Sequence, residues 1–138
     1  MKIGLKILLL LFLLMQSSCE DTIIYDCEDC NEEEPSDCDL SIKLSTVYSA
    51  TDTYRLTIYL GKVEDDMVIY DQVERLQSFN IRVPLNSEYT VKVVYKKDEK
   101  FYISINSIFP RVEYLEDYCE VPCYIIKDDK VDMRIKYY

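Results

Sequence analysis

The residues best suited to chemistry in this sequence are its cysteines. Four of them form two close pairs, in which two or three residues separate the thiols, and the other two stand alone. The six are Cys19, Cys27, Cys30, Cys38, Cys119 and Cys123. Thiols at such spacing can form disulfides, exchange disulfides or hold a soft metal ion. The compartment in which the chain folds decides among these three uses.

The start of the chain points to export. Lys2 and Lys6 precede nine consecutive apolar residues at 7–15, and Gln16, Ser17 and Ser18 then lead to Cys19. A basic start, an apolar centre and small residues before a cut make up an export signal. The apolar run is far shorter than the roughly 20 residues that span a bilayer. We therefore expect residues 1–18 to be a cleaved leader.

The stretch Gln16-Ser17-Ser18-Cys19 resembles the lipobox of bacterial lipoproteins. The usual leucine three positions before the cysteine is replaced by Gln16, as in the relaxed pattern of Bacteroidota-type surface lipoproteins. The resemblance implies cleavage before Cys19, acylation of its thiol and amine, and lipid anchoring without a transmembrane helix. Glu20 and Asp21 resemble the acidic residues that accompany transfer to the outer face of the outer membrane in that family. The alternative is an ordinary secreted protein that is cut near Ser18.

Export favours disulfides, because the compartments outside the cytosol are oxidising. Acylation of Cys19 would leave five thiols, so we expect two disulfides and one free thiol. The candidates are Cys27, Cys30, Cys38, Cys119 and Cys123, and their spacing does not determine the pairing. A disulfide that reaches Cys119 or Cys123 would pin the early part of the chain to the domain.

Two other uses of the cysteines compete with disulfides. A thiol-redox site would use Cys27 and Cys30, but Glu28 and Asp29 between them should raise the thiol pKa and slow such chemistry. A metal site would use four thiolates, which the two close pairs could supply.

Charge and composition exclude several classes of function. The chain has no histidine, which is the commonest general base and metal ligand at neutral pH. Its net charge is −10, or −12 without the leader, so we expect no nucleic-acid partner. Residues 20–39 hold ten acidic and no basic side chains, which predicts a solvated tether over residues 19–39. Calcium binding by this cluster is the alternative, although the EF-hand pattern is absent. No catalytic motif is present, so we expect no enzyme, cofactor or metal.

From residue 40 onward, apolar and polar residues alternate with the period of β-strands. In the strand expected at 101–106 we assign Phe101, Ile103 and Ile105 to the core and Tyr102 to the opposite face. A single helical turn is expected over residues 73–78. The expected strands cover residues 40–44, 54–60, 67–70, 79–85, 89–95, 101–106, 124–126 and 131–137.

About eight strands with short connections predict an all-β, antiparallel β-sandwich over residues 40–138, similar to an immunoglobulin or fibronectin-III domain. The domain also resembles the small sandwich domains of Bacteroidota-type surface lipoproteins. We therefore expect a lipid-anchored, non-enzymatic binding or accessory module at the outer membrane of a bacterial envelope. Its partners would be the membrane, through lipid on Cys19, and a protein or glycan. The alternative is a small envelope thiol-redox protein or enzyme that uses Cys27 and Cys30.

Overall fold

The computed structural model describes residues 27–46, 52–97, 99–117 and 119–135; the predicted leader and Cys19 lie outside the described residues. The described chain is almost entirely β-structure with two 3-10 turns, which confirms the predicted all-β sandwich. The turns are η1 (Cys27–Asp29) and η2 (Val63–Asp65). The strands are β1 (Asp37–Lys43), β2 (Thr53–Leu60), β3 (Val68–Glu74), β4 (Ser78–Pro84), β5 (Tyr89–Lys97), β6 (Lys100–Ile108), β7 (Arg111–Leu115), β8 (Cys123–Lys127) and β9 (Lys130–Asp132).

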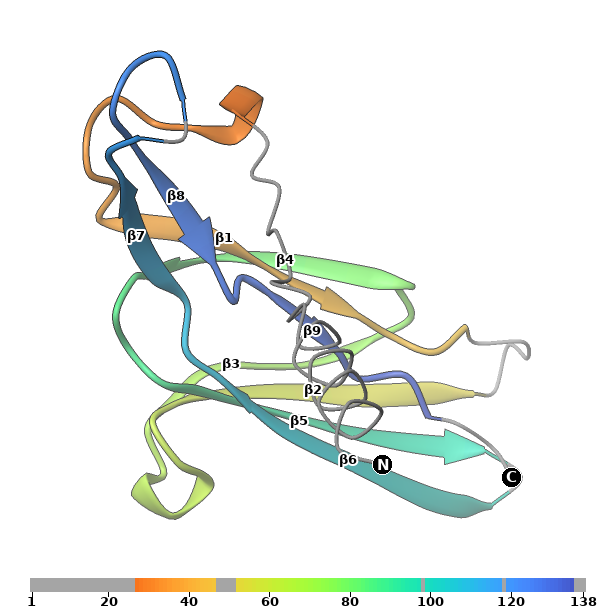
Figure 1. The fold of residues 1–138 in the computed structure, drawn as a ribbon. Coiled ribbons are helices and arrows are strands. Elements are labelled where there is room, and N and C mark those ends of the chain that lie inside the picture. The colour runs from red at the N-terminus through yellow and green to blue at the C-terminus, as the bar shows by residue number, and fades with distance from the viewer. Residues whose placement is uncertain (1–26, 47–51, 98, 118, 136–138) are drawn as a thin grey trace, which may run out of the picture.

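Two sheets face each other, and a hairpin extends from one end (Figure 1). One sheet has the order β4-β1-β9, the other has the order β3-β2-β5-β6, and β7 pairs with β8 in the hairpin. All pairs are antiparallel except β1 with β9. In an immunoglobulin sandwich the first strand shares a sheet with the second, fifth and fourth. Here the first strand lies between the fourth and the last, so the strand order is a different one.

The core lies between the two sheets and follows the period of two. Leu40 and Ile42 of β1, Leu56 and Ile58 of β2, and Val91 of β5 are completely buried. Burying one such side chain stabilises the fold by roughly 1.5–3 kcal/mol. The same cluster takes in Cys38 at one end of β1 and Met133 after β9. The apolar stripes of β1, β2 and β5 are therefore the main contacts that hold the sheets together.

One buried tyrosine of the larger sheet forms hydrogen bonds with the segments that follow β1 and β9. The hydroxyl of Tyr95, on β5, accepts a hydrogen bond from the backbone N–H of Ser45 at 3.1 Å. It donates another to the carbonyl of Met133 at 3.2 Å. The hydroxyl of Ser45 in turn accepts the N–H of Ile135 at 2.8 Å. These bonds satisfy polar groups that burial removes from water.

Four sequence-based expectations about local structure are wrong. The helical turn predicted over 73–78 is absent: Val73 pairs with Arg55 in the ladder between β2 and β3, and this pairing overrides the local preference. The strand at Arg111–Leu115 was not predicted. The last strand is limited to Lys130–Asp132, although Met133 still donates its N–H to the carbonyl of Lys43 at 2.9 Å. The domain begins before residue 40, because β1 starts at Asp37.

Strand β6 presents the face opposite to the one expected. Three alternate residues of β6 lie across from buried residues of β5: Tyr102 opposite Tyr95, Ser104 opposite Val93 and Asn106 opposite Val91. Side chains paired in this way lie on the same face of a sheet. The assignment of Phe101, Ile103 and Ile105 to the core is therefore wrong; they are 67%, 62% and 55% exposed on the outer face.

The role of the Tyr95 hydroxyl can be tested by replacing Tyr95 with phenylalanine. The ring stays, but the buried N–H of Ser45 and the carbonyl of Met133 lose their partner. We expect the free energy of unfolding to fall by about 1–3 kcal/mol, measured by denaturant titration. Tyr114→Phe is the matched control, because that ring is 52% exposed. Equal losses in the two variants would contradict this role.

Candidate functional site

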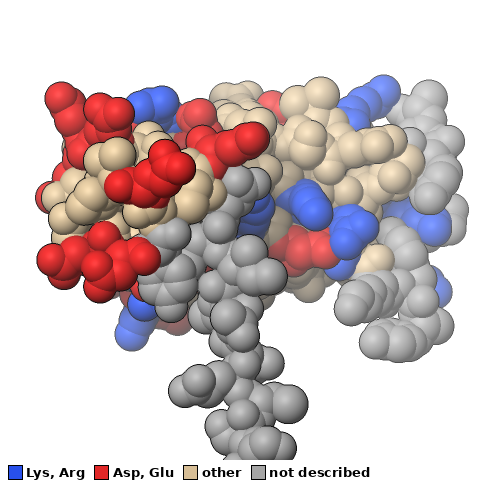
Figure 2. Space-filling model, turned by 45° about the horizontal axis from the view of Figure 1, so that its top comes forward, with Lys and Arg blue, Asp and Glu red and all other residues tan. Residues whose placement is uncertain are grey.

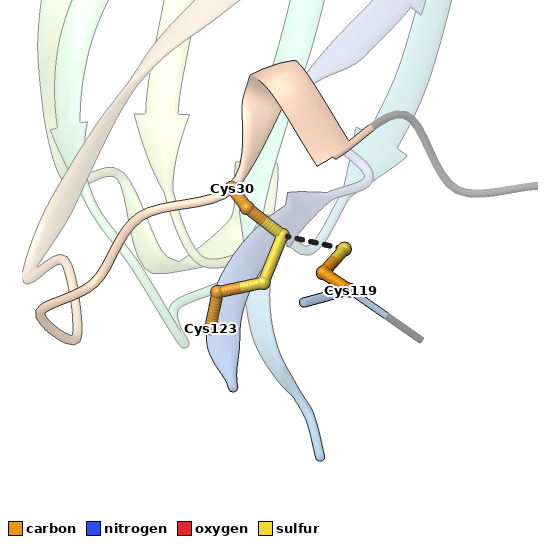
Figure 3. A group of neighbouring side chains, drawn as sticks. All are labelled: Cys30, Cys119 and Cys123. Atoms are coloured by element: carbon orange, nitrogen blue, oxygen red, sulfur yellow. Dashed lines mark hydrogen bonds between the residues drawn. A yellow bond between two sulfur atoms is a disulfide. The ribbon is translucent and has the colours of Figure 1, made fainter. Parts of the chain in front are cut away.

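Two disulfides join the segment before β1 to the hairpin β7–β8. Cys27 is bonded to Cys119 and Cys30 to Cys123, across sequence separations of 92 and 93 residues. Figure 3 shows Cys30 bonded to Cys123, with the sulfur of Cys119 beside them. We call these residues, Cys27, Cys30, Cys119 and Cys123, the four-cysteine clamp. The clamp confirms the prediction that two disulfides form and that they pin the early segment to the domain.

The backbone around the clamp explains this pairing. Residues three apart lie on the same side of a 3-10 turn, and η1 with the residue after it places Cys27 and Cys30 at this spacing. Asn31 then forms an antiparallel bridge with Tyr124, with N–H to carbonyl distances of 2.8 Å in both directions. The tether predicted over residues 19–39 is therefore wrong for its second half, because Asn31 is fixed to β8 and the segment from Asp37 onward belongs to β1, which pairs with β4. Residues 19–26 lie outside the described residues.

The sulfur atoms of the clamp lie close together. The Sγ atoms of Cys30 and Cys119, which belong to different disulfides, are 3.6 Å apart. The Sγ atoms of Cys30, Cys119 and Cys123 all lie within 4.8 Å of one another. A metal site needs free thiolates, whereas these sulfurs are bonded in pairs. Cys27 and Cys30 are not bonded to each other, so the pairing differs from that of a dithiol redox site.

The surroundings of the clamp are acidic. A pocket of about 480 Å³ opens beside it, lined by the four cysteines and by Glu32, Glu120, Val121 and Pro122. Residues 27–39 carry seven acidic and no basic side chains. Figure 2 shows acidic side chains gathered at one end of the molecule, with lysines and arginines more frequent toward the other. Within the described ranges, the sulfurs of Cys30, Cys119 and Cys123 are the only group of three or more cysteine or carboxylate ligand atoms that lie within 4.8 Å of one another.

Cys38 is the free thiol that the sequence predicted without identifying. It lies in β1 and is 3% exposed. Burial, followed by the negative charges of Asp129, Asp39 and Asp37, raises its pKa to about 11. Because the thiolate is the reactive form, the raised pKa and the burial both disfavour reaction of this thiol at neutral pH. Its structural role is to fill the core near the start of β1.

Comparison with known proteins gives no relative: no protein-family model, no curated protein and no solved structure matches this chain. Within residues 27–135, as far as they are described, no helix has the length and apolar character to cross a membrane.

The stability lost when one disulfide is removed should depend on whether the other disulfide is still present. With one bond intact, the second closes only a short loop and is worth about 2–3 kcal/mol, whereas the last remaining bond closes more than ninety residues and is worth about 4–5 kcal/mol. We expect Cys30→Ala with Cys123→Ala to lower the free energy of unfolding by the smaller amount. Adding Cys27→Ala and Cys119→Ala should cost the larger amount, measured in denaturant. Equal losses of unfolding free energy in the two steps would contradict the view that the disulfides stabilise the fold by closing loops of the chain.

The state of Cys38 can be tested by alkylation without reductant at pH 8. In a variant with Cys19→Ser, we expect no thiol to react in the native protein and one to react per chain after unfolding. The raised pKa and burial of Cys38 are the cause. Mass analysis of peptides locates the label. A label at Cys27 or Cys30 in the native protein would instead support the redox alternative.

Proposed function

We propose that this protein is a lipid-anchored, non-enzymatic binding or accessory module of a bacterial cell envelope, carried on the outer membrane by acyl chains on Cys19. The observation that supports it is the position of the clamp. Cys27 lies eight positions after Cys19, and eight extended residues span at most about 28 Å. Because the clamp fixes Cys27 to the hairpin, the folded domain would sit on the bilayer surface rather than at the end of a long tether.

The disulfides agree with this location. Bonds of this kind form and persist outside the cytosol, in compartments that an exported chain reaches. Both disulfides are formed by cysteines that follow the predicted cleavage point. Lipid on Cys19 would supply the anchor, because each buried CH2 is worth about 0.8 kcal/mol and two or more chains hold firmly.

The alternative, thiol chemistry at Cys27 and Cys30, is less well supported. Each of these sulfurs is bonded to a cysteine of the hairpin, at Cys119 and Cys123. The remaining thiol among the described residues, Cys38, is buried and has a raised pKa. The described cysteines therefore offer no exposed nucleophile, and a role in binding is the better proposal.

The anchor is tested by Cys19→Ser in the full chain. In the lipoprotein family that the leader resembles, cleavage follows acylation of the cysteine. We therefore expect the wild-type protein to carry acyl mass on Cys19 and to lack residues 1–18. The variant should carry no acyl group and should keep its leader. Intact mass analysis of membrane extracts measures both.

Cys38→Ala is the matched control for the loss of one thiol, and it should be acylated and cleaved like the wild type. A wild-type protein that is cut without any acyl mass, or that retains residues 1–18, would refute the proposed anchor.

A further inference from the structure

Strand β6 combines an open edge with an apolar outer face. It is the last strand of the sheet β3-β2-β5-β6, and no strand in the described part of the chain pairs with its other edge. Phe101, Ile103 and Ile105 are 67%, 62% and 55% exposed on its outer side. We call these three residues the β6 stripe. An exposed, apolar edge of this length is a template for pairing with another strand.

The other edges of the two sheets of the sandwich carry features that prevent such pairing, and residues 101–108 of β6 do not. Charges, proline, short length and bulges protect the edges of natural sheets. β4 carries Arg82 and Pro84, and β9 has only three residues. β3 carries two acidic residues and pairs with β2 through an irregular register at Ile58/Tyr59. Residues 101–108 of β6 contain no charged residue and no proline. This contrast indicates that β6 is covered in the functional protein.

We propose that β6 pairs antiparallel with β6 of a second copy of this chain, about a two-fold axis at Ile103. The two four-stranded sheets would then form one sheet of eight strands. The β6 stripe is symmetric about its centre, so Ile103 would face Ile103 of the second copy. Phe101 would face Ile105 of that copy, in both halves of the pair. Cross-strand apolar pairs of this kind stabilise a sheet.

The charges around the stripe agree with a second copy as the occupant. In this register Lys100 lies opposite Asn106, and Glu99 opposite Ser107, so no like charges face each other. An isologous contact requires such self-complementarity. On the outer face, Lys96 and Lys92 of β5 flank the stripe, next to Phe101 and Ile105. These lysines disfavour stacking of two outer faces, because lysine would then meet lysine, and they leave the edge as the route of association.

The test measures dimerisation of the mature protein by sedimentation and native mass spectrometry. We expect Ile103→Lys and Ile103→Asp each to weaken the dimer by more than about tenfold, because like charges would meet at the axis. Mixing the two variants should restore the dimer, since Lys would then face Asp. Only a contact in which residue 103 meets itself predicts this restoration.

Val73→Lys is the matched control. Val73 is 63% exposed on β3, at the opposite edge of the same sheet, whereas Ile103 is 62% exposed. We expect this variant to dimerise like the wild type. Phe101→Lys mixed with Ile105→Asp provides a second complementary pair if a variant at 103 fails to fold, which the denaturation midpoint would reveal.

The proposal is overturned if the wild-type protein is monomeric at about 100 μM, a concentration at which a dimer of micromolar affinity would be largely formed. It is also overturned if charge at 103 has no effect, if Val73→Lys weakens the dimer equally, or if the mixture stays monomeric. A monomer that binds lipid vesicles through the stripe would identify a different occupant. Acylation is not needed for any of these outcomes, so the test is separate from that of the anchor.

Discussion

The structure depends on one covalent constraint, the closure of the chain by the four-cysteine clamp. It brings the segment before β1 beside β8, where Asn31 and Tyr124 exchange backbone hydrogen bonds. One segment that leaves the clamp leads into β1, and the other leads through β8 into β9. Strands β1 and β9 pair in parallel in the same sheet. The carbonyl of Asp129 accepts the N–H of Ser41 at 2.8 Å at the start of this pairing. Closure therefore agrees with the pairing that places β1 and β9, from the two ends of the domain, side by side in one sheet.

The sequence predicts which residues share a face but not always which face is buried. Alternation identified six of the nine strands closely, yet it assigned the wrong face of β6 to the core. A strand with period two fits the core on either side, and the register with its neighbour makes the choice. The pairing of Lys97 with Lys100 in the hairpin fixes that register and places Tyr102 across from Tyr95. The connection between Lys97 and Lys100 sets this register, and the alternation of apolar and polar residues within β6 does not contain it.

For the cysteines, the number of bonds and their role could be predicted, and the partners could not. The pairing depends on a 3-10 turn and a single β-bridge, and neither has a pattern that stands out from an acidic segment. The position of Cys38 did have a signal. Cys38, Leu40 and Ile42 are two residues apart and share the buried face of β1. Because the expected tether ended at residue 39, the alternating pattern was traced only from Leu40, and Cys38 was not assigned to it.

The distribution of charge allows a molecule with an acidic clamp region to form a dimer through the β6 stripe. The acidic residues gather at one end of the domain, where the clamp lies, whereas residues 101–108 carry no charge. After β6 the chain leads through β7 to the clamp. An antiparallel pair of β6 strands would therefore send the two acidic ends in opposite directions. Repulsion between two chains of net charge −10 would be weakest in that arrangement, since exposed charges farther apart than about 10 Å are largely screened by salt. A parallel or face-to-face contact would bring the acidic ends, or the lysines of β5, together.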